Sequence, residues 1–154
     1  MIRVDAYTIA QRFSGLKEVP GQGDNPQILA MLKLDDDWPE HDEVPWCSAF
    51  MNYICWLLRL PRSKSLMARS WLEIGKPIHI SEARAGFDVV ILKRGGDDQP
   101  GPEVPDAPGH VGLFAGLEDT EVLLLGGNQG DRVRVSHFPV KRILGVRRLW
   151  DHIE

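Results

Sequence analysis

The chain of 154 residues carries a formal net charge of −4 at pH 7. Its length predicts a single domain, residues 1–154, that can bury a core without disulfides. A hydrophobic content of 43% with 26% charged residues is typical of a soluble globular protein. The acidic balance argues against a nucleic-acid partner and against attachment to anionic membranes, and no apolar run reaches the roughly 18 residues that a membrane span needs.

The first half of the chain is predicted to be largely helical. Helical segments are expected over four ranges, 4–16, 26–32, 47–59 and 65–74. Asn25 is predicted to cap the second helix with Pro26 at its first position, and Pro61 ends the third. The acidic, Pro-containing segment 35–45 is interpreted either as a solvated surface loop or as one wall of a cleft that approaches residue 47.

After residue 76 the apolar pattern changes to that of strands. Five strands are predicted, at 87–92, 111–115, 121–125, 132–135 and 143–149. Short connections favour antiparallel pairing, and the exception is residues 93–109, a Pro- and Gly-rich loop of a length that is usually functional. Helices followed by strands predict an α+β fold, in which N-terminal helices pack on a C-terminal antiparallel sheet of about five strands.

Cys47 is predicted to lie where a Pro-bounded loop turns into a helix. A helix start stabilises a thiolate, so Cys47 is a candidate nucleophile, and its backbone N–H could also bind an oxyanion. The alternative is an ordinary buried cysteine, because Cys is among the most buried residue types. The second cysteine, Cys55, lies about 12 Å along the same helix, too far for a disulfide, and is expected in the core. Two cysteines without a second pair at metal-ligand spacing predict no metal site.

A histidine and an amide residue stand at predicted strand ends downstream of Cys47. His110 follows the Gly- and Pro-rich loop and opens a strand, which favours it over the other histidines as the base that takes the thiol proton. Asn128 could accept a hydrogen bond from the His110 ring and fix its tautomer. The alternatives are an ordinary strand-end histidine and a plain Gly-Gly-Asn hairpin turn. The order Cys, His, Asn matches that of papain-like enzymes.

Candidate substrate-binding residues surround this trio. They are Glu43, Trp46, Ser48, Trp71 and Gln129. A carboxylate at Glu43 could hold a substrate amine, and the two tryptophans could line a cleft. Surface charge for Glu43 and core packing for the tryptophans are the alternative roles.

Several stretches of the chain form recognisable motifs. They are Glu43-Val-Pro-Trp-Cys-Ser-Ala-Phe-Met-Asn52, Ala68-Arg-Ser-Trp71, Gly109-His-Val-Gly-Leu113, Leu125-Gly-Gly-Asn-Gln129, Arg142-Ile-Leu-Gly-Val-Arg147, Glu18-Val-Pro-Gly21 and Asn25-Pro26. Together they resemble a bacterial and phage branch of the CHAP/NlpC-like cysteine peptidase superfamily. These stretches are spread over nearly the whole chain. The Pro-Trp-Cys-Ser-Ala-Phe and Gly-His-Val-Gly motifs, in that order, are the most specific part of the resemblance.

The resemblance implies a papain-like α+β fold and an enzyme that hydrolyses an amide bond of peptidoglycan. Members act either as stem-peptide endopeptidases or as N-acetylmuramoyl-L-alanine amidases. Carried over to this chain, Cys47 is the nucleophile, His110 the base and Asn128 the orienting residue. The family implies no cofactor, and its expected substrate is peptidoglycan or a peptide, with neither nucleic acid nor membrane insertion.

The N-terminal residues lack the apolar segment of an ordinary signal peptide. We therefore expect synthesis in the cytoplasm and action on the cell wall or periplasm after release or secretion, as a phage lysin or an injected antibacterial effector. Export machinery or a cognate inhibitor would then be partners. Two other functions fit the same residues: a catalytically silent module that binds a glycan or peptide, and a thiol hydrolase or deamidase with a protein substrate.

Overall fold

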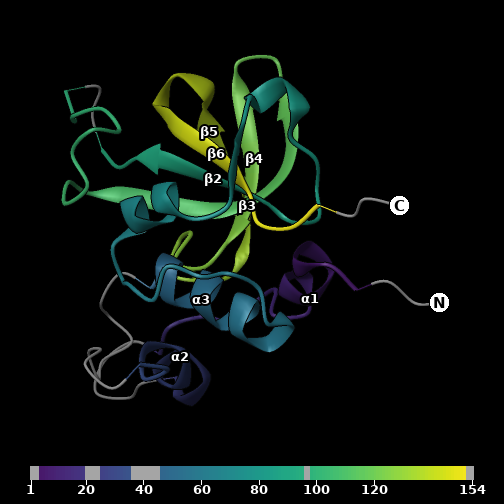
Figure 1. Ribbon diagram of the computed structural model, residues 1–154. Coiled ribbons are helices and arrows are strands. Elements are labelled where there is room, and N and C mark those ends of the chain that lie inside the picture. Colours follow the sequence, from purple (N-terminus) through teal and green to yellow (C-terminus); the bar gives the residue numbers. More distant parts are fainter. Residues whose placement is uncertain (1–3, 20–24, 36–45, 96–97, 152–154) are drawn as a thin grey trace.

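The computed structural model describes residues 4–19, 25–35, 46–95 and 98–151. Three helices, α1 (Ala6–Gln11), α2 (Pro26–Leu32) and α3 (Cys47–Leu58), lie together on one side of a sheet, with α2 farthest from it (Figure 1). A 3-10 helix, η1 (Ala68–Glu73), replaces the predicted fourth helix. Within the described ranges, no helix is long and apolar enough to cross a membrane.

The helix boundaries follow local signals in the sequence. The Asn25 side chain accepts a hydrogen bond from the Gln27 backbone N–H at 2.9 Å and Pro26 takes the first helical position, which confirms the predicted cap of α2. α1 is shorter than the predicted range 4–16. It begins at its cap Asp5 and gives way to turns that reach Gly15, whose φ of 90° is left-handed.

Six strands form one antiparallel sheet. They are β1 (Lys76–Ile78), β2 (Asp88–Lys93), β3 (Gly109–Glu118), β4 (Glu121–Gly126), β5 (Arg134–Pro139) and β6 (Ile143–Arg148), in the order β1-β6-β2-β3-β4-β5. The predicted number of about five was one short, because β1 has three residues and contains Pro77, which weakens its strand pattern. The predicted strand 132–135 lies further along the chain, as β5, an edge strand that can end in Pro139.

The core lies on both faces of this sheet. Successive residues of β2 alternate between two apolar clusters, with Val89 and Ile91 facing the helices and Val90 and Leu92 facing the other way. All four side chains are fully buried, which explains why β2 is a continuous apolar run in the sequence. Helices packed on an antiparallel sheet confirm the predicted α+β fold.

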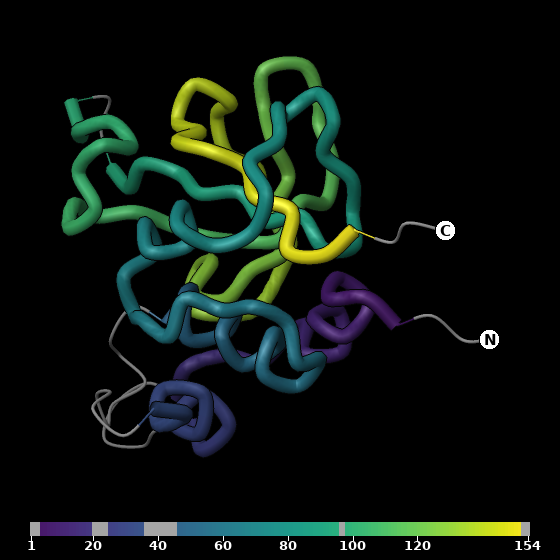
Figure 2. The backbone as a smooth tube through the Cα atoms, in the orientation of Figure 1, coloured from purple at the N-terminus to yellow at the C-terminus, as the bar shows by residue number. Residues whose placement is uncertain are grey.

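The long connection between β2 and β3 projects from one end of the sheet. Its described residues form the teal-to-green segment on the left of Figure 2. β3 begins at Gly109, and the register sets His110 opposite Leu92 of β2. β3 packs against α3, and its first residues lie beside the start of α3, where Cys47 is found.

Candidate active site

Cys47 is the first residue of α3 and is 2% exposed. The residue before it, Trp46, provides no side-chain cap, and the first helical hydrogen bond runs from the Phe50 N–H to the Trp46 carbonyl at 2.9 Å. The N–H groups of the first turn therefore point past the start of the helix, where they favour negative charge. The predicted placement of Cys47 at a helix start is confirmed.

Cys47 and His110 are hydrogen-bonded to each other across the interface between α3 and β3. Burial raises the pKa of Cys47. Four interactions lower it: the charge of His110, the hydrogen bond to the His110 ring, the Val111 backbone N–H and the charge of Arg94. Together they bring the pKa of Cys47 below its ordinary value. Burial has the opposite effect on His110 and lowers its pKa. The charge of the Cys47 thiolate and the hydrogen bonds to Cys47 and Gln129 are larger in sum, so the pKa of His110 is raised. The pair is therefore stabilised as thiolate and imidazolium.

Gln129 holds the other side of the His110 ring. Its Oε1 lies 2.9 Å from His110 Nε2. The Gln129 amide nitrogen donates to the carbonyls of Leu124 and Arg134, at 3.0 and 2.7 Å, which fixes Oε1 as the atom that faces the ring. His110 Nε2 must then carry a proton, and Nδ1 is left as the nitrogen that exchanges a proton with the sulfur.

Asn128 does not occupy the predicted orienting position. Continuing the register of the Leu113–Leu125 pair would set residue 128 opposite His110, but β4 ends at Gly126. Asn128 adopts a left-handed φ of 58°, which Asn tolerates better than most residues, and the chain turns there. The hydrogen bond assigned from the sequence to Asn128 is made by the next residue, Gln129, which was predicted to bind substrate.

Two glycines make room for the Gln129 side chain. A Cβ atom on Gly126 would lie 2.6 Å from Gln129 Oε1, and one on Gly112 would lie 3.4 Å from it. Gln129 is 4% exposed as a result. The sequence therefore contains a signal for this contact, namely Gly112 two residues after His110 and Gly126 three residues before Gln129. The two glycines do not by themselves identify which side chain fills the space.

Three further candidates are structural. Trp46, Ser48 and Trp71 are each fully buried, so they present no surface to a substrate in this structure. Trp71 Nε1 donates to Ser48 Oγ at 2.9 Å, which ties η1 to α3. Trp46 Nε1 donates to Glu18 Oε1 at 2.8 Å. The fifth candidate, Glu43, lies outside the described residues.

A cleft of about 330 Å³ opens beside His110. Its described lining is Arg94, His110, Asn128, Gln129, Gly130, Arg134, Ser136, His137, Phe138 and Arg142. The Phe138 ring lies 5.2 Å from the His110 ring, centroid to centroid. The arginines and Phe138 were not predicted as site residues, because no motif in the sequence links Arg94, which follows β2, to the segment from Arg134 to Arg142.

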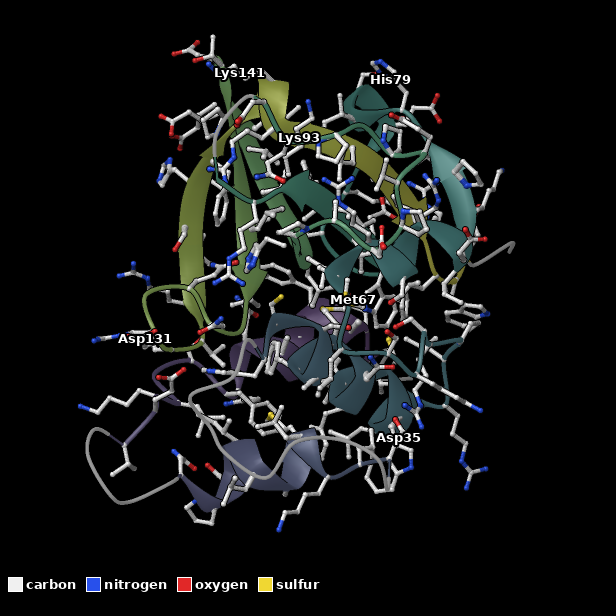
Figure 3. All side chains as sticks on the ribbon, turned by 90° about the vertical axis from the view of Figure 1, so that its left-hand side faces the viewer. Asp35, Met67, His79, Lys93, Asp131 and Lys141 are labelled. Atoms are coloured by element: carbon white, nitrogen blue, oxygen red, sulfur yellow. The ribbon has the colours of Figure 1, made fainter. Side chains whose placement is uncertain are left out.

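Figure 3 shows on which side of the molecule the cleft arginines lie. Lys93 and Lys141, the sequence neighbours of two of them, are in its upper part, and Asp35 is in its lower part, beyond α3. Arg142 Nε donates to the Lys93 carbonyl at 3.2 Å, which joins these two segments. The cleft therefore belongs to the sheet side of the site, away from α2.

Arg69 of η1 fastens the loop that leads to His110. Arg69 is 1% exposed, and its guanidinium donates to the carbonyls of Pro100, Gly101, Val104 and Pro108, at 2.9, 2.7, 3.1 and 3.1 Å. In the described part of the chain it has no carboxylate partner, so loop carbonyls alone solvate this charge. A loop predicted to be functional is thus held in place by a buried cation.

We expect Arg69→Met to lower the free energy of unfolding by about 2–4 kcal/mol, because four loop carbonyls lose a charged donor at once. Urea unfolding measures this change, and limited proteolysis between residues 98 and 108 reports the release of the loop. Arg12→Met removes the same charge from an exposed position and should change stability by less than about 0.5 kcal/mol. Equal stability of the two variants would show that Arg69 does not anchor the loop.

The described residues contain no group of three His, Cys, Asp or Glu side chains that could hold a metal ion. The site itself offers a polarised thiol, an imidazole with a fixed tautomer and the N–H groups of a helix start. Together they suit nucleophilic attack on a carbonyl and proton transfer to a leaving group.

Comparison with known proteins identifies the fold. No protein-family model and no curated protein matches the chain. The structure is similar to NlpC1 from Trichomonas vaginalis, with a TM-score of 0.55 and 16% identity over 96% of this chain and 44% of that one. It is also similar to NlpC2 from Trichomonas vaginalis, with a TM-score of 0.57 and 17% identity over 99% of this chain and 49% of that one.

The chain thus spans about half the length of these two solved structures. At such identities the likeness shows the fold, which is the NlpC-like, papain-like α+β arrangement expected from the resemblance. The narrower assignment to a bacterial and phage branch stays a prediction.

Proposed function

We propose that the protein is a thiol hydrolase that cleaves an amide bond of the peptidoglycan stem peptide, as an endopeptidase or an N-acetylmuramoyl-L-alanine amidase. The observation that carries this proposal is the hydrogen-bonded Cys47–His110 pair at the start of α3, with the His110 tautomer fixed by Gln129. The NlpC-like fold supports a hydrolase of this type.

In the proposed mechanism the Cys47 thiolate attacks the amide carbonyl. The backbone N–H groups at the start of α3 stabilise the resulting oxyanion, since they lack partners within the helix. His110 then protonates the leaving nitrogen, the C–N bond breaks, and a thioester with Cys47 remains. Neutral His110 next takes a proton from water, the hydroxide attacks the thioester, and the carboxylic acid product leaves as Cys47 is regenerated.

Peptidoglycan as the substrate rests on the resemblance of the Cys47 and His110 motifs to wall-degrading enzymes. This substrate lies outside the cytoplasm, so the proposal requires a delivery route such as a phage lysis system or a secretion apparatus. A cognate inhibitor in the producing cell would fit the same proposal.

A catalytically silent binding module is disfavoured by the state of the thiol. A lowered pKa at Cys47 and a raised pKa at His110 serve no purpose in a surface that only binds. A protein substrate, in contrast, requires the same catalytic groups. Digestion of purified cell walls distinguishes a wall substrate from a protein substrate.

The test is digestion of purified peptidoglycan by the wild-type protein and by Cys47→Ala, with released fragments identified by mass spectrometry. We expect wall fragments from the wild type and a fall in rate of at least about 10³-fold for Cys47→Ala, because no other described group can form the acyl-enzyme. The fragment masses then name the bond.

Cys55→Ala is the matched control, since it makes the same change at the other cysteine, which lies in the core of α3. It should digest walls at close to the wild-type rate. If neither Gram-negative nor Gram-positive walls release fragments with the wild type, peptidoglycan is not the substrate. Equal digestion by Cys47→Ala would reject the thiol mechanism.

A further inference from the structure

The cleft beside His110 is strongly cationic although the chain has a net charge of −4. Arg94 directly follows β2, Arg134 lies on β5, and Arg142 closes the 3-10 helix η3 (Val140–Arg142). β5 and η3 are consecutive in the sequence, whereas Arg94 comes from a segment 40 residues before Arg134, and the fold brings the three arginines to one cleft. His137 adds a fourth basic group to the lining. The cleft therefore concentrates positive charge at one end of the sheet.

These guanidinium groups are available to a ligand. Within the described part of the chain, none of Arg94, Arg134 and Arg142 forms an ion pair, and Arg142 uses Nε for the Lys93 carbonyl, 3.2 Å away. The described lining includes no carboxylate. Glu118 lies at the border, with Oε2 3.7 Å from His137 Nδ1. Arginine forks that form no ion pair within the protein are suited to bind a carboxylate through paired hydrogen bonds.

The position of the cleft indicates which half of the substrate it receives. His110 and Gln129 belong to its lining, and Cys47 does not. In the proposed reaction His110 gives its proton to the leaving nitrogen, so the part of the substrate attached to that nitrogen extends toward His110 and away from the sulfur. The cleft beyond His110 is therefore on the side of the leaving group.

We propose that the Arg94, Arg134 and Arg142 cleft binds a carboxylate on the leaving-group side of the scissile amide. The substrate would be an amide whose amine component is an amino acid or peptide with a free carboxylate close to the cleaved bond. A carboxylate is preferred to a phosphate, because amines released from peptide amides carry carboxyl groups. The placement of the leaving group in this cleft rests on the proposed function. The binding of an anion by the three arginines does not.

A first test needs no hydrolysis and compares alkylation of Cys47 by iodoacetate and by iodoacetamide. The two reagents differ in whether they carry a carboxylate or a neutral amide. We expect the ratio of their rate constants, iodoacetate over iodoacetamide, to fall about threefold to tenfold in Arg134→Met and in Arg142→Met. High salt should lower the wild-type ratio toward that of the variants.

Arg12→Met is the control, because it removes one exposed positive charge that does not line the cleft. Its ratio should equal that of the wild type. Arg94 is left unchanged in this test, since its charge also lowers the pKa of Cys47, after the larger effects of burial and of His110. A ratio that is the same in all four proteins would overturn the anion site, whether or not the protein digests cell walls.

A second test concerns the leaving group. The stem peptide cleaved in the wall digestion is prepared with the carboxylates of its leaving residue either free or converted to carboxamides. We expect wild-type kcat/KM to be about tenfold higher for the free carboxylate than for the carboxamide, and this ratio to fall to about two or less in Arg134→Met. Hydrolysis of both forms with equal kcat/KM would overturn the proposal and leave the proposed function standing.

Discussion

Iodoacetamide is expected to alkylate Cys47 at about pH 6 to 7 and to leave Cys55 unmodified in the folded protein. Burial raises the pKa of Cys55 to about 12, so its thiolate fraction at neutral pH is only about 10⁻⁵. Cys47 has a lowered pKa despite equal burial, because His110, the Val111 N–H and Arg94 outweigh desolvation. Peptide mapping by mass spectrometry after timed alkylation measures both sites in one sample.

The pH dependence of this reaction gives a second readout of the pair. Because the pKa of Cys47 is lowered, its alkylation should remain fast well below the ordinary thiol pKa of about 8.5, and slow only when the thiolate is protonated. Hydrolysis should also decline on the alkaline side, above the raised pKa of His110, because the leaving nitrogen then lacks its proton donor. The pH range of activity therefore has an acid limit set by protonation of Cys47 and an alkaline limit set by deprotonation of His110.

His110→Ala provides the control for this interpretation. It removes the charge and the hydrogen bond that offset burial at Cys47, so the pKa of the thiol should rise above its ordinary value. The alkylation rate at about pH 6 should fall by at least about 10²-fold. If Cys47 in the wild type instead titrated like a free thiol, near pH 8.5, the thiolate–imidazolium pair would not exist.

Gln129→Ala is expected to lower kcat about 10- to 100-fold, with a smaller change in KM. The Gln129 amide makes one hydrogen bond to the His110 ring, and a bond to a charged group contributes about 1.5–3 kcal/mol. Without it the imidazole can rotate and change tautomer, so fewer molecules have Nδ1 directed at the sulfur. Steady-state kinetics on the wall-derived substrate measures the effect.

The pH profile separates positioning of His110 from a general loss of stability. The pKa of His110 is lowered by burial and raised by the Cys47 thiolate and by the hydrogen bonds to Cys47 and Gln129. Gln129→Ala removes the last of these, so the pKa of His110 should fall and the alkaline limit of activity should move to lower pH. A variant that was merely less stable would keep the wild-type pH profile in its folded fraction.

Asn128→Gly is the matched control one residue away. Glycine adopts the left-handed φ of 58° without strain, so this change removes the Asn side chain and keeps the turn. Its kcat should stay within about threefold of the wild type. A large loss in Asn128→Gly together with a small loss in Gln129→Ala would restore the assignment made from the sequence.

Local sequence signals were sufficient for most of the elements and for two residues of the candidate site. The Asn25–Pro26 cap, the helix that starts at Cys47 and the strand that opens before His110 all depend on neighbours within a few residues. Cap chemistry, apolar period and turn residues act over that range, so they can be recognised without a structure. The α+β order of elements followed from the same signals.

Contacts between distant segments were decided by the tertiary structure. The register of β3 and β4 and the left-handed turn at Asn128 determine that Gln129 reaches His110. A change of one residue at a strand end redirects a side chain completely, and sequence periodicity does not resolve it.

The sequence by itself thus determined most of the helices and strands, and which thiol and imidazole belong to the candidate site. The tertiary structure decided that Trp46 and Trp71 are buried, that Arg69 anchors the long loop, and that three arginines from separate elements share a cleft. The physical reason is that secondary structure depends mainly on short-range propensities, whereas burial, hydrogen-bond partners and electric fields depend on residues that folding brings together.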